Sequence, residues 1–224
     1  LYQDQSFTNF TINLTNSTFN KFSVSSNTLV VTGTLTALDG GISSGNISAQ
    51  GNVDVESTWN GNTLGTLEFL GSSDQIFDLT GATTRFNENI TVNKTGGQAR
   101  LASDLTMDAS GQDLTIVEGE FDLQGNNLTV NGSGGTFVVQ DGGTFTRFGS
   151  ETTTFPTLNS GSTYEYTGNG DGSADTYSVG STYENLTIDA GLDTIELAEA
   201  ADVNNNLTII SGTLDVSSNN YGIT

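Results

Sequence analysis

The fold is best argued from residues 105–130, LTMDASGQDLTIVEGEFDLQGNNLTV. Three runs in it, Leu105-Thr-Met, Leu114-Thr-Ile-Val and Leu128-Thr-Val, alternate apolar and polar residues, as half-buried β-strands do. The residues between the runs are mostly Gly, Asn, Asp, Ser and Gln, and the first four of these types favour tight turns. Similar runs recur along the chain, and no stretch has a convincing helical period, so the sequence predicts an all-β protein.

The spacing of these runs predicts how the strands are connected. Equivalent positions recur every 21–24 residues, which fits a coil of about three short strands stacked on the coil before it. We therefore expect a right-handed parallel β-helix, or β-solenoid, with tandem β-sandwiches as the alternative. The pairs that define the spacing are Ile90 and Leu114, Leu114 and Phe137, Leu105 and Leu128, and Leu186 and Leu207.

A longer repeat is superimposed on the short one. Asn89-Ile-Thr-Val-Asn-Lys corresponds to Asn185-Leu-Thr-Ile-Asp-Ala, 96 residues later. We therefore divide the chain into a first long repeat (68–164) and a second, incomplete one (165–224). The lead-in (1–67) is expected to form divergent coils or a strand that pairs with a neighbouring molecule, because Phe10, Ile12 and Leu14 alternate cleanly with polar residues.

Composition excludes several classes of function. Only 33 % of the residues are hydrophobic, which suits a thin solenoid better than a thick globular core. The net charge of −21, with five scattered cations, excludes a nucleic-acid binder, which needs clustered positive charge. No apolar run is long enough to cross a membrane as a helix, so no membrane insertion is expected. The absence of His and Cys removes histidine-based and thiol-based catalysis.

The greater part of the chain resembles a known kind of protein. The runs Gly161-Ser-Thr-Tyr-Glu-Tyr-Thr-Gly, Thr182-Tyr-Glu-Asn-Leu-Thr-Ile and Asn206-Leu-Thr-Ile-Ile-Ser-Gly-Thr-Leu-Asp-Val are similar to the repeats of large bacterial surface proteins. Those adhesin-like chains are built as right-handed parallel β-helices. The resemblance covers residues 65–224, and it implies a secreted, cell-surface repeat protein without catalytic residues to transfer.

Pairs of carboxylates are the candidates for catalysis. Two carboxylates within about 5–10 Å of each other can serve as acid and base in the cleavage of polysaccharides. A solvated face or a turn explains the same pattern, and the sequence places no cluster of cations or aromatic residues around the pairs. The pairs are Asp113 with Glu118, Glu120 with Asp122, and Asp189 with Asp193.

One acidic loop is the candidate for a metal site. Asn169, Asp171, Ser173 and Asp175 place oxygen atoms at alternate positions, as calcium loops do. The full calcium-loop motif fails because Thr167 stands at its first position, and a plain turn gives the same pattern. Calcium is therefore the one cofactor that the sequence suggests, and we expect no organic cofactor.

Glycosylation motifs form a third group of candidate sites. Asn-x-Ser/Thr occurs ten times, and the cluster at Asn9, Asn13 and Asn16 is the one that we expect to be most exposed. Chance explains the motif as well, because Asn-containing turns here run into Thr-rich strands.

The most consistent interpretation is a secreted, extracellular structural or adhesive surface protein that is not an enzyme. The second long repeat stops inside a strand-like run, Tyr221-Gly-Ile-Thr. We therefore expect either further chain or end-to-end self-association into a filament. Glycans on a host or neighbouring cell surface are further expected partners. The alternatives are a polysaccharide-active β-helix enzyme and a glycan-binding, phage-type spike.

Overall fold

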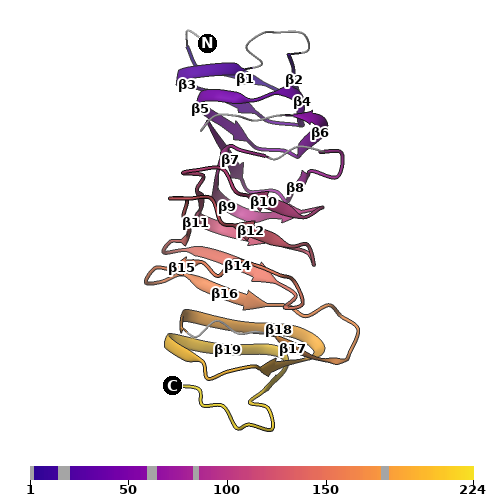
Figure 1. Ribbon diagram of the computed structural model, residues 1–224, viewed down its shortest axis with the longest axis vertical. Coiled ribbons are helices and arrows are strands. Elements are labelled where there is room, and N and C mark those ends of the chain that lie inside the picture. The colour runs from indigo at the N-terminus through magenta and orange to yellow at the C-terminus, as the bar shows by residue number, and fades with distance from the viewer. Residues whose placement is uncertain (1–2, 15–20, 60–64, 83–85, 178–181) are drawn as a thin grey trace.

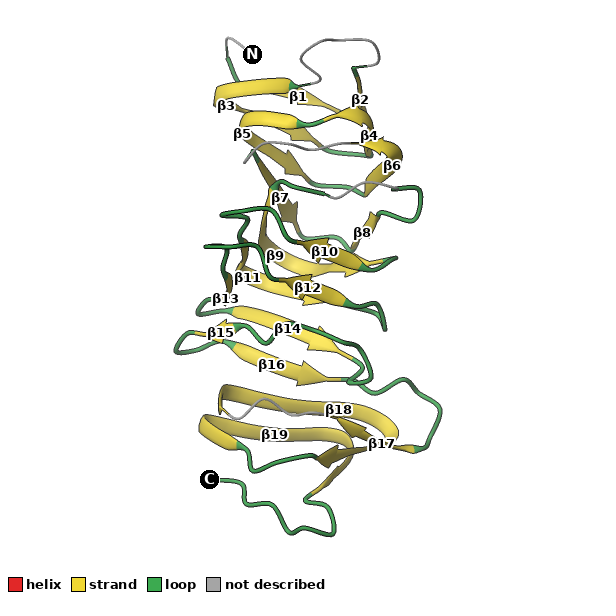
Figure 2. Ribbon diagram, in the orientation of Figure 1, coloured by secondary structure: helices red, strands yellow, loops and turns green. Residues whose placement is uncertain are grey.

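The computed structural model describes residues 3–14, 21–59, 65–82, 86–177 and 182–224 of the chain, and it contains β-strands and no helix there (Figure 2). The N-terminal strands are β1 (Gln5–Phe7), β2 (Phe10–Asn13), β3 (Phe22–Val31), β4 (Leu35–Gly40), β5 (Ile42–Ala49), β6 (Val53–Trp59), β7 (Thr66–Gly71) and β8 (Gln75–Asp78). The central strands are β9 (Asn89–Leu101), β10 (Leu105–Met107), β11 (Leu114–Asp122), β12 (Leu128–Val130), β13 (Phe137–Val139) and β14 (Gly143–Arg147). The C-terminal strands are β15 (Thr157–Leu158), β16 (Thr163–Tyr166), β17 (Ala174–Tyr177), β18 (Thr182–Leu197) and β19 (Asp202–Asp215).

All strand pairs between the described residues are parallel, and they stack as a β-solenoid of about 8 turns. The molecule is a rod with the N-terminus at one end and the C-terminal coil at the other (Figure 1). The predicted all-β parallel β-helix is therefore confirmed. The alternative of tandem β-sandwiches is wrong, because sandwich sheets are built from antiparallel strands.

Each spacing that the sequence singled out is a real register between adjacent coils. Leu114 pairs with Ile90 on one side and with Phe137 on the other. Leu105 pairs with Leu128 in the small sheet of β10 and β12, and Leu186 pairs with Leu207. The apolar side chains therefore stack in rows, and each row buries the one before it.

A central coil has three strand segments, and the first two merge into one bent strand. In β11 the first segment pairs with β13 and the second with β14, and the bend between them is at Gly119. Gly119 has φ of 79°, and a Cβ atom there would lie 2.6 Å from the backbone oxygen of Lys94. Glycine is required at this corner, because it is the one residue without a Cβ atom and with free access to positive φ.

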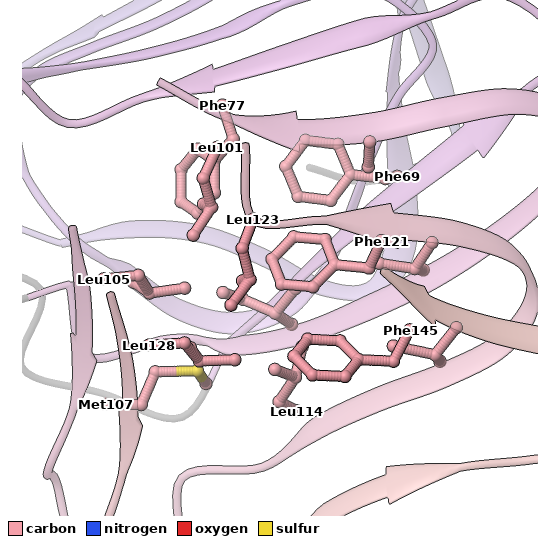
Figure 3. Packing of buried hydrophobic residues seen from close by; sticks show 14 of the residues in the cluster. Phe69, Phe77, Leu101, Leu105, Met107, Leu114, Phe121, Leu123, Leu128 and Phe145 are labelled. Carbon is pink, nitrogen blue, oxygen red and sulfur yellow. The ribbon is translucent and has the colours of Figure 1, made fainter. Parts of the chain in front are cut away.

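The core is a narrow column enclosed by the three faces of the coil. Phe121 and Phe145 are fully buried and lie above one another in adjacent coils (Figure 3). Leu105, Leu128 and Met107 close the column from the β10–β12 face. Burial of each such side chain stabilises the fold by about 1.5–3 kcal/mol, so the column is a continuous source of stability.

The lead-in forms ordinary coils at the N-terminal end of the same rod. The strand β1 pairs with β3, and β2 pairs with β4, both within this chain. Phe10 packs against the core from the first coil, and Ile12 is 3 % exposed. The apolar alternation around these residues therefore covers the end of the column.

Candidate functional site

The candidate site lies on the outer face of the central coils. Outward residues of β9, β11, β14 and β16 stand in one row, because parallel pairing keeps equivalent positions in register. Asp122 pairs with Arg100 on one side and with Thr146 on the other, and Thr146 pairs with Glu165. Side chains from four coils are thus brought together in an arrangement that no local stretch of sequence contains.

A groove of about 410 Å³ runs across this row. Four carboxylates line it, those of Glu120, Asp122, Glu165 and Asp189. The amides of Gln98, Gln124 and Asn169 line it too, together with the ring of Phe148. A volume of this size lies within the range of small-molecule sites.

Burial and mutual repulsion change how the carboxylates titrate. Burial raises the pKa of Glu165 to about 7, and the negative charges of Glu120, Asp189 and Asp122 add to the rise. Burial also raises the pKa of Asp122, although hydrogen bonds from Gln124 and the charge of Arg100 counteract it. Carboxyl groups that stay protonated near neutral pH are common at functional sites, because they can donate a proton or a hydrogen bond.

Arg100 only partly neutralises the groove. Its guanidinium lies 3.2 Å from the carboxylate of Asp74, outside the groove lining, and 4.0 Å from that of Asp122. Its Nε also donates a 2.5 Å hydrogen bond to Gln98. The cation is therefore shared, and Glu165 and Asp189 have no ion pair with a described cation.

Thr146 contributes a hydroxyl group that is buried without a partner. The residue is 1 % exposed, it lines the groove, and its Oγ1 has no hydrogen-bond partner among the described residues. A buried hydroxyl without a partner costs about 1–3 kcal/mol. A polar atom bound in the groove would remove that cost.

A buried ion pair holds the aromatic wall of the groove in place. Arg147 and Glu151 are each 5 % exposed, and their side chains are 3.3 Å apart. Glu151 also accepts hydrogen bonds from the backbone N–H groups of Phe148 (2.8 Å) and Gly149 (2.7 Å). The loop that carries the ring is thereby fixed from the inside, so the groove is preformed.

The three predicted carboxylate pairs have different positions relative to the groove. Glu120 and Asp122 both line the groove. Asp189 lines it as well, whereas its predicted partner Asp193 is fully buried and accepts hydrogen bonds from backbone N–H groups. The remaining pair lies outside the lining, and Asp113 there accepts two hydrogen bonds from Thr136.

The predicted calcium loop is folded around Asp193. The backbone N–H groups of Gly170 and Gly172 donate to its carboxylate at 2.7 and 2.6 Å. Asp171 is exposed and accepts a hydrogen bond from the N–H of Ser173 at 2.8 Å, and its own N–H donates to Asn169 at 2.9 Å.

Calcium binding by this loop stays a prediction. The side chain of Asp175 lies outside the described residues. Among the side chains that are described, no three acidic groups are arranged to hold a metal ion.

Two of the three predicted glycosylation sites lie in the described part of the chain. Asn9 and Asn13 are exposed in the first coil. The side-chain oxygen of Asn9 accepts a 2.8 Å hydrogen bond from the N–H of Thr34. Asn16 lies outside the described residues.

Sequence reasoning missed Glu165, Thr146 and Phe148 as groove residues. Glu165 is 43 positions from Asp122 in the sequence. The coils that separate Asp122, Thr146 and Glu165 differ in length, with 24 residues from Asp122 to Thr146 and 19 from Thr146 to Glu165. A search at a fixed period therefore passes over Glu165.

Comparison with protein families, with curated proteins and with solved structures finds no match for this chain. Among the described residues, no helix is both long and apolar enough to span a membrane.

Proposed function

We propose that this chain is a secreted structural and adhesive surface protein, similar to adhesin repeats, whose rod presents the acidic groove to a glycan. The observation that carries the proposal is the groove itself, on the side of a stiff solenoid. It combines an aromatic ring, three side-chain amides, threonine hydroxyls and carboxylates. Such a set offers a sugar both an apolar surface and many hydrogen-bond partners.

The rod supplies what an adhesive scaffold requires. Its coils repeat along one axis, so length is gained by adding turns without redesign of the core. The high negative charge keeps such a surface soluble and self-repelling at its sides. Ladders of polar side chains, such as Asn185 with Asn206 at 3.0 Å, tie neighbouring coils together on the outside.

Binding of the purified chain to an oligosaccharide panel tests the adhesive function. The variant Phe148→Ala removes the ring of the groove, and Glu118→Gln changes an exposed carboxylate outside the groove. We expect the first variant to lose binding at least tenfold and the second to bind like the wild type. Absence of binding to every oligosaccharide would overturn the glycan-binding part of the proposal.

End-to-end association is the second part of the proposal, and the C-terminal coil supports it. Leu207 and Ile209 belong to the inward rows of β19 but are 39 % and 51 % exposed. A further coil of the same kind, supplied by a second copy, would bury them. Sedimentation of the wild type and of Ile209→Glu over a wide concentration range tests this. We expect assembly that the variant abolishes, and a wild type that stays monomeric throughout would count against it.

A polysaccharide-active enzyme is the second candidate, and one observation favours it. Burial, together with the negative charges of Glu120, Asp189 and Asp122, raises the pKa of Glu165 to about 7. A protonated carboxyl next to an ionised one can divide the roles of acid and base in glycoside cleavage. Release of reducing ends from neutral oligosaccharides, lost in Glu165→Gln, would support this candidate, and intact oligosaccharide after prolonged incubation would exclude it.

A further inference from the structure

The charge of the groove restricts which saccharide it can accept. With all side chains ionised, four carboxylates and one guanidinium leave a net charge of −3 in the lining. Arg100 is itself shared with Asp74, outside the lining. A uronic acid or another anionic sugar would add a negative charge to a half-buried, already repulsive site. A positively charged group would instead relieve that repulsion, since Coulomb energies grow as water is excluded.

Thr146 lies at the point of the groove where a ligand cation would meet the most acceptors. Its unpartnered hydroxyl stands in the row between Asp122 and Glu165. A ligand ammonium placed there can donate to this oxygen and to the carboxylates on either side of it. The three hydrogens of an ammonium group match that number of acceptors.

The rest of the lining argues against a bare metal ion as the occupant. Within the described residues no three acidic side chains are arranged to hold one. A groove of about 410 Å³ is also far larger than an ion requires. Phe148 and the amides Gln98 and Gln124 provide contacts for the ring and hydroxyls of a sugar.

We propose that the groove binds a saccharide with a free ammonium group, an amino sugar, and holds that ammonium between Asp122, Thr146 and Glu165. The inference rests on the proposed glycan-binding function and names its ligand class. Binding is coupled to a proton, because an adjacent cation favours the ionised form of Glu165. The charges that act on Glu165 are those of Glu120 and Asp122 of β11 and Asp189 of β18, and Arg100 of β9 shares the groove lining with it.

The test is calorimetric titration at pH 6.5 with four probes: a glucosamine trisaccharide, its fully N-acetylated counterpart, a galacturonate trisaccharide and spermidine. We expect the glucosamine trisaccharide to bind at least tenfold more tightly than each of the others. Repetition in buffers of different ionisation enthalpy should show that part of a proton is released on binding. Equal or tighter binding of the N-acetylated sugar would overturn the ammonium inference and leave the glycan-binding function intact. Equal binding of spermidine would overturn the saccharide part.

Variants of the groove residues test whether the ligand binds in the groove. Glu165→Gln and Thr146→Val keep the shape of the side chain and remove one acceptor each, so each should weaken glucosamine trisaccharide binding about tenfold. The matched control is Glu118→Gln, which removes the same charge from an exposed position of β11 and should bind like the wild type. If Glu165→Gln and Thr146→Val both bind as tightly as Glu118→Gln, the site is refuted, because binding would then not depend on the side chains of the groove. If no saccharide binds the wild type, both the inference and the glycan-binding function fail.

Discussion

Glu88 should make the stability of the rod fall as pH rises toward neutrality. Its side chain is 0 % exposed inside the solenoid, where it accepts hydrogen bonds from the indole N–H of Trp59 (3.2 Å) and the backbone N–H of Ile42 (3.1 Å). Burial raises the pKa of this carboxyl from 4.5 to about 7, although both hydrogen bonds counteract the rise. The folded state therefore keeps a proton that the unfolded state has lost between these two values.

The sign and the size follow from proton linkage. Between pH 4.5 and about 7 the folded state binds more protons than the unfolded state, so the free energy of unfolding decreases with pH in this window. At about 1.4 kcal/mol per pH unit, the shift of the Glu88 pKa corresponds to a loss of about 3 kcal/mol. Below pH 4.5 and above pH 7 this carboxyl adds no further pH dependence.

Urea unfolding of the wild type and of Glu88→Gln from pH 4 to pH 8 measures the effect. The glutamine cannot ionise, so the difference between the two proteins should change by about 3 kcal/mol across the window. A constant offset is expected at every pH, because the amide can accept from only one of the two donors. Trp59, the only tryptophan in the sequence, should change its emission with a midpoint near pH 7. Parallel stability curves for the two proteins would refute the assignment, and Glu118→Gln serves as the exposed control.

Three further results are expected. Gly119→Ala should destabilise the fold by well over the roughly 1–2 kcal/mol that a left-handed alanine costs by itself, because its Cβ would meet the backbone of the coil above. In the same urea titration, Gly134→Ala should lower the free energy of unfolding by that intrinsic cost alone, because its φ is 78° and no atom lies within 4 Å of the new Cβ. Glu165→Gln should be more stable than the wild type above pH 7, where the ionised side chain is repelled by three carboxylates; no gain at pH 8 would show that the groove is well solvated. If the Asn169–Asp175 loop binds calcium, the melting temperature should rise with added calcium and fall back with chelator, and an unchanged value would remove the prediction.

The amino-acid sequence alone determined where the central strands lie and that they stack in coils. An alternating run such as Leu114-Thr-Ile-Val buries one face whatever surrounds it, and an interval of 21–24 residues returns the chain to the same height on the next coil. The sequence intervals of 23 and 24 residues are the same as the strand registers in the structure, because neighbouring coils in the centre of the rod have nearly equal lengths.

Only the tertiary structure decided which face each run occupies. The 96-residue repeat aligns Ile90 with Leu186, yet Ile90 pairs with Leu114, whereas Leu186 stands in the row of Tyr164 and Phe121. The face is set by the summed length of all intervening coils, so a coil of 19 residues changes the phase of everything after it. Asp122, Thr146 and Glu165 meet for the same reason. Local pattern determines what becomes a strand, and accumulated length determines which side chains share a site.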